Sequence, residues 1–310
     1  MDIRPQDLPE LRAEALLWQA ANGDKMLTRW SELGVDYGAL SPAEFARQAW
    51  RYEMERLGSA TLFYITRPMV QLALVAAESL PDFRISPEDL PALTGLMVFE
   101  EPLPFGIHWD DGDVSRTRAL LWSISDRLMA VGGLLVTTYV DKEEFARTIS
   151  GPEGTRFHGP GLIAMTGSTF TSGFADESWT KENLKKAADR MECVTSGQLL
   201  PALLAAWLLM QQPLTLEVEV ESDRAARKRL RRAGQEPKPV RVIELRRPKG
   251  NSEKGDGSRE YRHQWITRGH WRQHWYPKRQ VHRPVWIAPH VKGPEGAPLI
   301  GGEKVYAWKR

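Results

Sequence analysis

The stretch Gly133-Leu-Leu-Val-Thr-Thr-Tyr-Val140 combines β-branched, aromatic and aliphatic residues, a composition that favours a β-strand. Three further apolar runs lie on either side of it, with Gly, Pro and Asp between them. They cover residues 96–99, 119–124 and 162–166. Short strands with short connections favour hairpins, so we expect an antiparallel meander that forms a central sheet.

The first eighty residues have the pattern of helices. A first helix is predicted from Leu11 to a stop at Asn22-Gly23. Ser41-Pro-Ala-Glu44 is a capping box with proline at the first helical position, and it predicts a second helix that ends at Gly58. A third helix is predicted over residues 69–79.

A later helix is predicted over residues 180–211, and its second part, 199–210, is apolar on all sides and therefore buried. That part spans about a dozen residues, whereas a membrane crossing needs about 20. We therefore predict an α+β fold with a helical N-terminal part (1–90), a central antiparallel sheet with this buried helix packed on it (91–222), and a basic C-terminal region (223–310) that completes or extends the sheet.

Charge is distributed very unevenly along the chain. Residues 222–310 hold 23 Lys+Arg against 8 Asp+Glu, a net charge of +15, and the total of +2 leaves −13 for residues 1–221. Such an asymmetry indicates a nucleic-acid or acidic partner for the basic end. The alternative is that the basic region packs on the acidic body of the same chain.

The basic region begins after Leu214-Thr-Leu-Glu-Val-Glu-Val-Glu221, whose strict alternation predicts a half-buried strand with a row of carboxylates facing solvent. Residues 223–232 then predict a strongly basic helix ended by Gly234, and residues 240–245 another strand. The helix carries a candidate basic patch for phosphates, formed by Arg227, Lys228, Arg231 and Arg232. A solvated charged face is the alternative.

Residues 261–277 interleave Arg, His and Trp, a mixture that offers stacking faces, cation–π partners and forked hydrogen-bond donors. This chemistry suits the binding of a flexible polyanion or an extended peptide. The candidate binding residues are His263, Trp265, Arg268, His270, Trp271, Arg272, Trp275, Tyr276, Arg283 and Trp286. In the alternative, the tryptophans fill a core that the histidines and arginines border. The spacing leaves helix and strand open, although Gly269 weakens the helix.

No metal or cofactor is expected. The single cysteine, Cys193, excludes an internal disulfide and a Cys-rich zinc site, and Glu260 is the only carboxylate between 257 and 294. Asp110, Asp111 and Asp113 are interpreted as a hairpin turn. The start of the chain shows no secretory signal. We expect a cytoplasmic protein without a membrane partner.

One motif resembles a known family. His263-x-Trp-Ile-x-Arg-Gly-His-Trp-Arg-x-x-Trp275, followed by His282-Arg-Pro-Val-Trp-Ile-Ala-Pro289, resembles the C-terminal motif of the type V-A anti-CRISPR proteins that block biogenesis of the CRISPR effector nuclease. Weaker similarity covers residues 197–204 and 96–99, and the resemblance lies mainly in the C-terminal third of the chain. The resemblance implies a protein that recognises the N-terminal segment of a target polypeptide during translation and causes loss of its message.

The expected function is therefore non-enzymatic recognition of a nascent or extended peptide, near the ribosome and its RNA. Two alternatives stay open. The first is a metal-independent, toxin-like RNA-cleaving nuclease that uses His270, His274 and Arg268, because His and Arg can act as acid, base and phosphate clamp. The second is a DNA-binding regulator.

Overall fold

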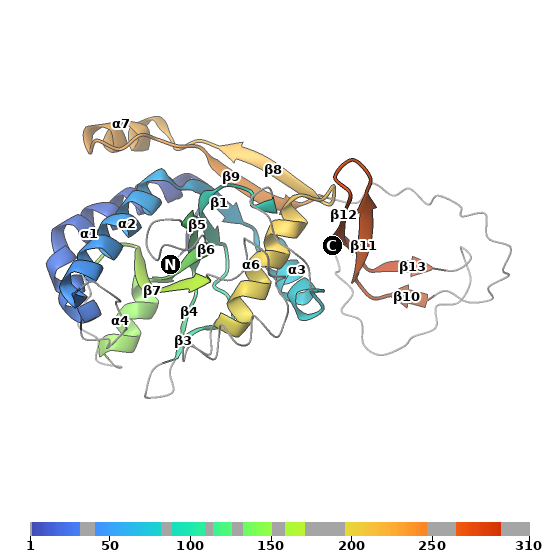
Figure 1. Ribbon diagram of the computed structural model, residues 1–310. Helices are drawn as coiled ribbons and strands as arrows, with labels where there is room; N and C mark the ends of the chain where they lie inside the picture. Colours follow the sequence, from blue (N-terminus) through green and yellow to red (C-terminus); the bar gives the residue numbers. More distant parts are fainter. Residues whose placement is uncertain are drawn as a thin grey trace, which may run out of the picture.

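The computed structural model describes residues 2–31, 41–81, 89–108, 114–125, 133–150, 159–170, 196–246 and 265–292. A seven-stranded sheet lies at its centre, in the order β7-β6-β5-β2-β1-β9-β8 (Figure 1). Its strands are β1 (Thr61–Ile65), β2 (Thr94–Phe99), β5 (Ala119–Ser125), β6 (Gly133–Asp141), β7 (Leu162–Phe170), β8 (Thr215–Val220) and β9 (Val240–Leu245). A short hairpin pairs β3 (Gly106–His108) with β4 (Val114–Arg116).

The predicted α+β class and the antiparallel meander are confirmed, because β2, β5, β6 and β7 pair in antiparallel order. The sheet as a whole is mixed, since β1 runs parallel to both β2 and β9. Strand β1 lies within the part that was expected to be helical. Four of its five residues are buried, and a short strand covered on both faces is uniformly apolar, so periodicity does not separate it from a helix segment.

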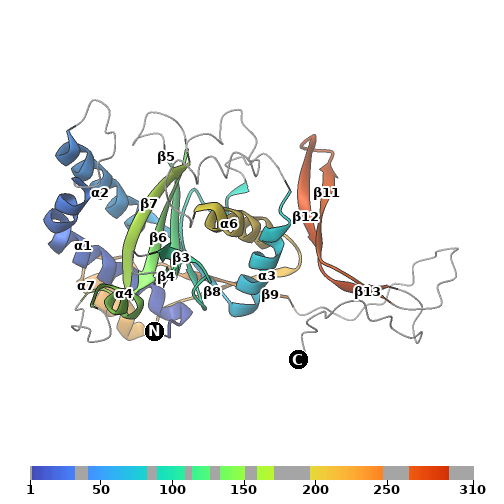
Figure 2. The same ribbon diagram turned by 90° about the horizontal axis from the view of Figure 1, so that it is seen from below.

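Helices cover both faces of the sheet (Figures 1 and 2). One face is covered by η1, α1 and α2, and the other by α3 and α6. Their bounds, with those of two further helices in the described part of the chain, are η1 (Pro5–Asp7), α1 (Leu8–Ser31), α2 (Pro42–Ser59), α3 (Arg67–Glu78), α4 (Lys142–Ser150), α6 (Ser196–Met210) and α7 (Arg224–Arg232). Within the described residues, no helix has both the length and the apolar character that a membrane crossing requires.

The capping box at the start of α2 is confirmed. Ser41 Oγ accepts a hydrogen bond from the Glu44 amide at 3.3 Å, and the Glu44 carboxylate accepts one from the Ser41 amide at 3.1 Å. The predicted stop of the first helix is wrong, because α1 continues through Asn22-Gly23 to Ser31. A glycine inside a helix costs about 1 kcal/mol relative to alanine, a penalty that packing against α2 can offset.

The α3–α6 face holds the larger apolar core, built around Trp122. Its ring lies 5.5 Å from that of Phe63 and 5.3 Å from that of Trp207 on α6, and its Nε1 donates to the Ala92 carbonyl at 2.9 Å. A Cβ on Gly95 would lie only 2.3 Å from the Trp122 ring, so this position requires glycine. Helix α6 is thus buried as predicted, while residues 180–195 lie outside the described part.

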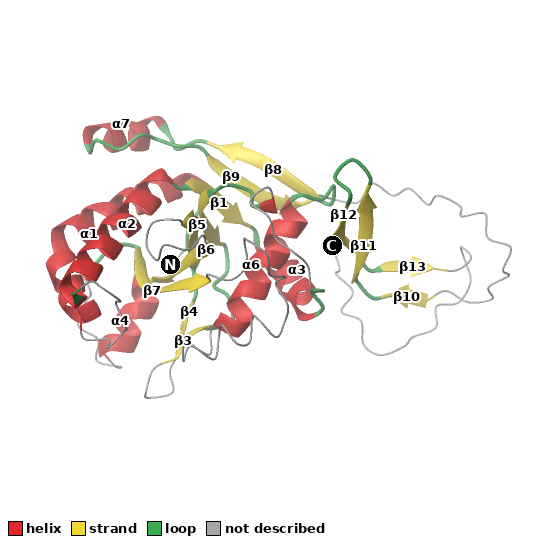
Figure 3. Ribbon diagram, in the orientation of Figure 1, coloured by secondary structure: helices red, strands yellow, loops and turns green. Residues whose placement is uncertain are grey.

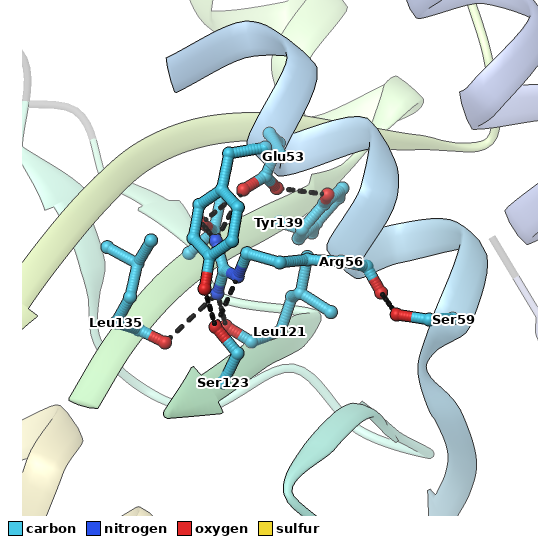
Figure 4. Close-up of polar contacts among 9 residues, drawn as sticks. Glu53, Arg56, Ser59, Leu121, Ser123, Leu135 and Tyr139 are labelled. Carbon is cyan, nitrogen blue, oxygen red and sulfur yellow. Dashed lines mark hydrogen bonds and ion pairs between the residues drawn. The ribbon is translucent and has the colours of Figure 1, made fainter. Parts of the chain in front are cut away.

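On the other face of the sheet, a buried ion pair within α2 holds this helix against the strands (Figure 4). Arg56 and Glu53 are 2% and 5% exposed, and Arg56 Nη1 lies 2.6 Å from Glu53 Oε2. The same guanidinium donates to the main-chain carbonyls of Leu121 on β5 and Leu135 on β6, at 3.1 and 2.9 Å. One arginine therefore links the helix to two adjacent strands.

Side chains of the sheet complete this network. Tyr139 Oη donates to Glu53 Oε1 at 2.6 Å, and Thr137 Oγ1 donates to Glu53 Oε2 at 2.9 Å. Ser123 Oγ accepts from Arg56 Nε at 2.8 Å. Burial, followed by the nearby Glu53 carboxylate, raises the pKa of the Tyr139 phenol well above its ordinary value, so it stays a donor.

Candidate binding surface on the C-terminal ribbon

The Arg, His and Trp cluster lies on strands. Strand β10 (Trp265–Thr267) pairs with β13 (His290–Lys292), and β11 (His270–Tyr276) pairs with β12 (Val281–Ile287), both antiparallel. The same register holds on both sides of the interruption at residues 268–269 and 288–289. The four strands therefore form one two-stranded hairpin over residues 265–292, which we call the ribbon.

The ribbon stands beside α3 and α6 and is separate from the central sheet (Figures 2 and 3). The basic region thus completes the sheet through β9, while its later strands pair only with each other within the described residues. The inner face of the ribbon packs on helices, because Trp271 and Trp286 contribute to the apolar core of the α3–α6 face.

Two tryptophans on opposite strands anchor the ribbon. Trp286 is 3% exposed and lies edge-on to Trp271, with ring centroids 5.3 Å apart. Trp271 Nε1 donates to the Ala76 carbonyl on α3 at 2.8 Å, and the Trp286 amide donates to Gln212 Oε1 at 3.0 Å. A Cβ on Gly269 would lie 2.4 Å from the Trp286 ring. Glycine at 269 is what allows this indole to pack beneath the strand.

An ion pair adds to this anchor. The Arg283 guanidinium contacts the Asp89 carboxylate, and the two side chains are 14% and 5% exposed. Gln211 on the segment after α6 donates to the Asp89 carbonyl. Arg283, one of the predicted binding residues, is therefore committed to holding the ribbon on the body of the protein.

Side chains near the turn of the hairpin face solvent. Trp275 is 45% exposed and Tyr276 is 39% exposed. The Trp275 ring lies 4.8 Å from that of its cross-strand partner His282, and the His274 ring lies edge-on to Tyr276 at 4.9 Å. We call residues 274–282, with the exposed Lys278 and Arg279 in the turn, the ribbon tip.

The ribbon has no negative side chain. No Asp or Glu occurs between Glu260 and Glu295, whereas Arg268, Arg272, Lys278 and Arg279 are all exposed. The tip therefore presents cations and aromatic rings without a competing carboxylate of its own, an arrangement typical of surfaces that bind a single-stranded nucleic acid.

The candidate nuclease residues are not brought together. His270 and His274 lie on the same face of β11, but four residues along a strand span about 13 Å. His270 Nδ1 lies 3.1 Å from the Arg268 carbonyl oxygen, and His274 packs on Tyr276. A general acid and a general base for one phosphodiester must both come within hydrogen-bond reach of it, so this spacing argues against such a pair.

The predicted basic helix is confirmed as α7. Asp223 Oδ1 caps it by accepting from the Ala226 amide at 2.7 Å, and its Ala226 and Leu230 are buried. Two of its arginines are engaged within the chain, Arg229 with Glu10 at 2.7 Å and Arg227 with Glu221 at 2.6 Å.

The rest of the α7 patch, Lys228, Arg231 and Arg232, is exposed. The packing of the basic region on the acidic body of the same chain therefore explains part of the uneven charge distribution. It leaves the remaining α7 cations and those of the ribbon facing solvent.

Several sequence predictions lie outside the described residues, namely His263, Cys193, Asp110, Asp111 and Asp113. Trp265 is placed only by its backbone in β10. Among the residues that are described, no group of three or more His, Cys, Asp or Glu is arranged to hold a metal ion.

The predicted binding residues did not include Lys278, Arg279 or His282, although His282 opens the second part of the C-terminal motif. The signal that locates them is the Pro277-Lys-Arg-Gln280 turn, where Gln280 adopts a positive φ of 51°.

The fold and the ribbon define an α+β protein with an exposed, carboxylate-free, aromatic and basic hairpin beside its core. No protein-family model matches the chain, and no curated protein matches it. Among solved structures it is similar to one described as the crystal structure of AcrVA2, with 13% sequence identity and a TM-score of 0.39 over 92% of this chain and 93% of that chain. A similarity at that TM-score supports no statement about function.

Proposed function

We propose that this protein is a non-enzymatic regulator that recognises an extended N-terminal peptide of a nascent target protein and thereby causes translation-coupled loss of its mRNA. The sequence resemblance in residues 263–289 is the basis for proposing a peptide target and the loss of its message. The observation that carries a binding role is the exposed ribbon, which is rich in cations and aromatic rings and has no carboxylate.

In this proposal the ribbon tip and the adjacent Arg272 contact RNA of the ribosome or of the message. Lys278, Arg279 and Arg272 are suited to phosphates, and Trp275 and Tyr276 to the faces of unpaired bases. The contact between buried Trp286 and half-buried Trp271 holds the hairpin in place before binding, which reduces the entropy that binding must offset.

Ribosome profiling with and without expression tests the function. We expect footprints and reads to fall for one or a few messages, with the loss dependent on the start of the coding sequence. Purified protein should leave naked RNA intact. Cleavage that disappears in His270→Ala or His274→Ala would instead establish the nuclease, and tighter binding to duplex DNA than to single-stranded RNA would favour the DNA-binding regulator.

Trp275→Ala should weaken single-stranded RNA binding at every salt concentration by about 1–3 kcal/mol, since it removes one stacking face. The double variant Arg272→Gln/Lys278→Gln should act differently and lower the slope of log affinity against log salt by about 0.7 per lost phosphate contact. Fluorescence anisotropy with a labelled RNA oligonucleotide over a salt series measures both effects.

The α7 double variant Lys228→Gln/Arg231→Gln removes the same charge from another surface and serves as the matched comparison. A fall in slope there as well would assign phosphate contacts to α7 in addition to the ribbon. Unchanged RNA affinity in Trp275→Ala would remove the ribbon tip from the binding surface.

A further inference from the structure

Among the residues that the structure describes, no strand covers the outer edge of β8. Strand β8 is last in the strand order, and β9 is its only strand neighbour within the described residues. In Figure 1 it lies along the upper rim of the molecule. The unpaired backbone groups of such an edge can accept a further strand.

The register shows which backbone groups point outward. The Arg246 amide donates to the Leu214 carbonyl at 2.8 Å, so residues 214 and 246 form a hydrogen-bonded pair. Such pairs recur at every second residue of an antiparallel ladder, which places Leu216 opposite Glu244 and Val218 opposite Val242 in the same class. The amides and carbonyls of Glu217 and Glu219 therefore face away from β9.

Side chains beside this edge form two different rows. Leu216 and Val218 are 39% and 41% exposed, unusually high for large aliphatic residues on a sheet, because the described helices on their face do not cover this part of β8. Glu217 and Glu219 occupy the other face, with Arg241 of β9 3.5 Å from Glu217. The predicted half-buried strand is thus exposed on both faces over most of its length.

A second copy of the chain fits this edge poorly. The backbone amides and carbonyls of residues 215, 217, 219 and 221 point away from β9. If two copies paired through this edge, the registers that align most of the strand would place a glutamate of one copy opposite a glutamate of the other. Directly opposed like charges destabilise a strand pair. The same carboxylates favour a strand that carries cations.

We propose that the β8 edge binds an extended cationic segment of the target peptide as an added strand. This inference rests on the proposed function in taking the target to be an extended peptide. Main-chain hydrogen bonds to Glu217 and Glu219 hold the segment, and side chains select its sequence. Basic residues lie opposite the two glutamates, and the apolar residue between them lies beside Leu216 and Val218.

The probe is a peptide of alternating Lys and Val, compared with one of alternating Glu and Val and with a Lys–Val peptide that is N-methylated at alternate residues. Isothermal titration calorimetry on the full chain should show binding of the first peptide only. The charge-reversed variant Glu217→Lys/Glu219→Lys should exchange the preference. Equal binding of the methylated peptide would show simple charge attraction and overturn the proposal.

Glu219→Pro tests the edge itself. The Glu219 amide points away from β9, so proline removes an outward donor without removing a bond of the β8–β9 ladder. We expect about a tenfold loss of affinity for the Lys–Val peptide, which corresponds to roughly one good hydrogen bond. Glu219→Gln keeps the amide and controls for the charge, and thermal unfolding controls for the fold.

The outcomes separate the two proposals. Concentration-dependent dimers that disappear in Glu219→Pro would assign the edge to a second copy and overturn this inference. Unchanged message loss in Glu219→Pro would also overturn it and leave the proposed function standing. Peptide binding at β8 without any message loss would contradict the proposed function alone.

Discussion

Arg56→Met should lower the free energy of unfolding by about 3–5 kcal/mol, because it leaves a buried carboxylate without its cation. Arg56 is 2% exposed and contacts Glu53, Thr137 and Ser123 as well as carbonyls of β5 and β6. Methionine retains the aliphatic volume but none of the donors. Urea unfolding followed by circular dichroism measures the change.

Two variants show whether the loss comes from burial. Arg4 and Asp7 form an ion pair with the same spacing of three residues, but Arg4 is exposed, so Arg4→Met should have a far smaller effect. The double variant Glu53→Gln/Arg56→Met removes the isolated charge and should recover part of the stability. If Arg56→Met unfolds at the same urea concentration as the native protein, the network does not stabilise α2 on the sheet.

Local signals were enough to predict much of the fold. From the sequence alone, the β-branched composition of residues 133–140 predicted β6, and the Ser41–Glu44 capping box predicted the start of α2. Strand β1 was missed because its central position in the sheet removes the alternation that identifies half-buried strands. Its parallel pairing with β9, across about 180 residues of sequence, depends on tertiary packing that no local pattern contains.

The candidate site was predictable in composition but not in arrangement. The sequence identified the cluster around Arg268 and Trp271, yet helix and strand stayed open there. Trp271 and Trp275 are four residues apart on β11, so alternation places both on the same face of the strand. Trp271 and its cross-strand partner Trp286 pack against the core beside α3 and α6, whereas Trp275, nearer the turn, is 45% exposed. The partner of Trp271, the Ala76 carbonyl, lies 195 residues earlier in the chain, so only the folded structure shows it.

Trp286→Ala should lower the free energy of unfolding by about 3–5 kcal/mol, the usual cost of removing a large buried aromatic side chain. Its indole is 3% exposed, packs edge-on to Trp271 and fills the space that Gly269 leaves. Since these contacts join the ribbon to α3 and α6, the variant should also release the ribbon. Proteolysis between residues 265 and 292 under native conditions measures that release, and urea unfolding measures the stability.

Trp275→Ala is the matched control, because it is the same substitution on the same hairpin at a side chain that is 45% exposed. Its free energy of unfolding should stay close to that of the native protein, while its affinity for single-stranded RNA falls. The Trp286→Ala variant should lose RNA affinity only in the fraction of molecules whose ribbon is released. A temperature low enough to keep the ribbon docked should therefore restore RNA binding. Equal destabilisation by the two variants would show that the tip is part of the core and would contradict the division of the ribbon into an anchored part and a binding part.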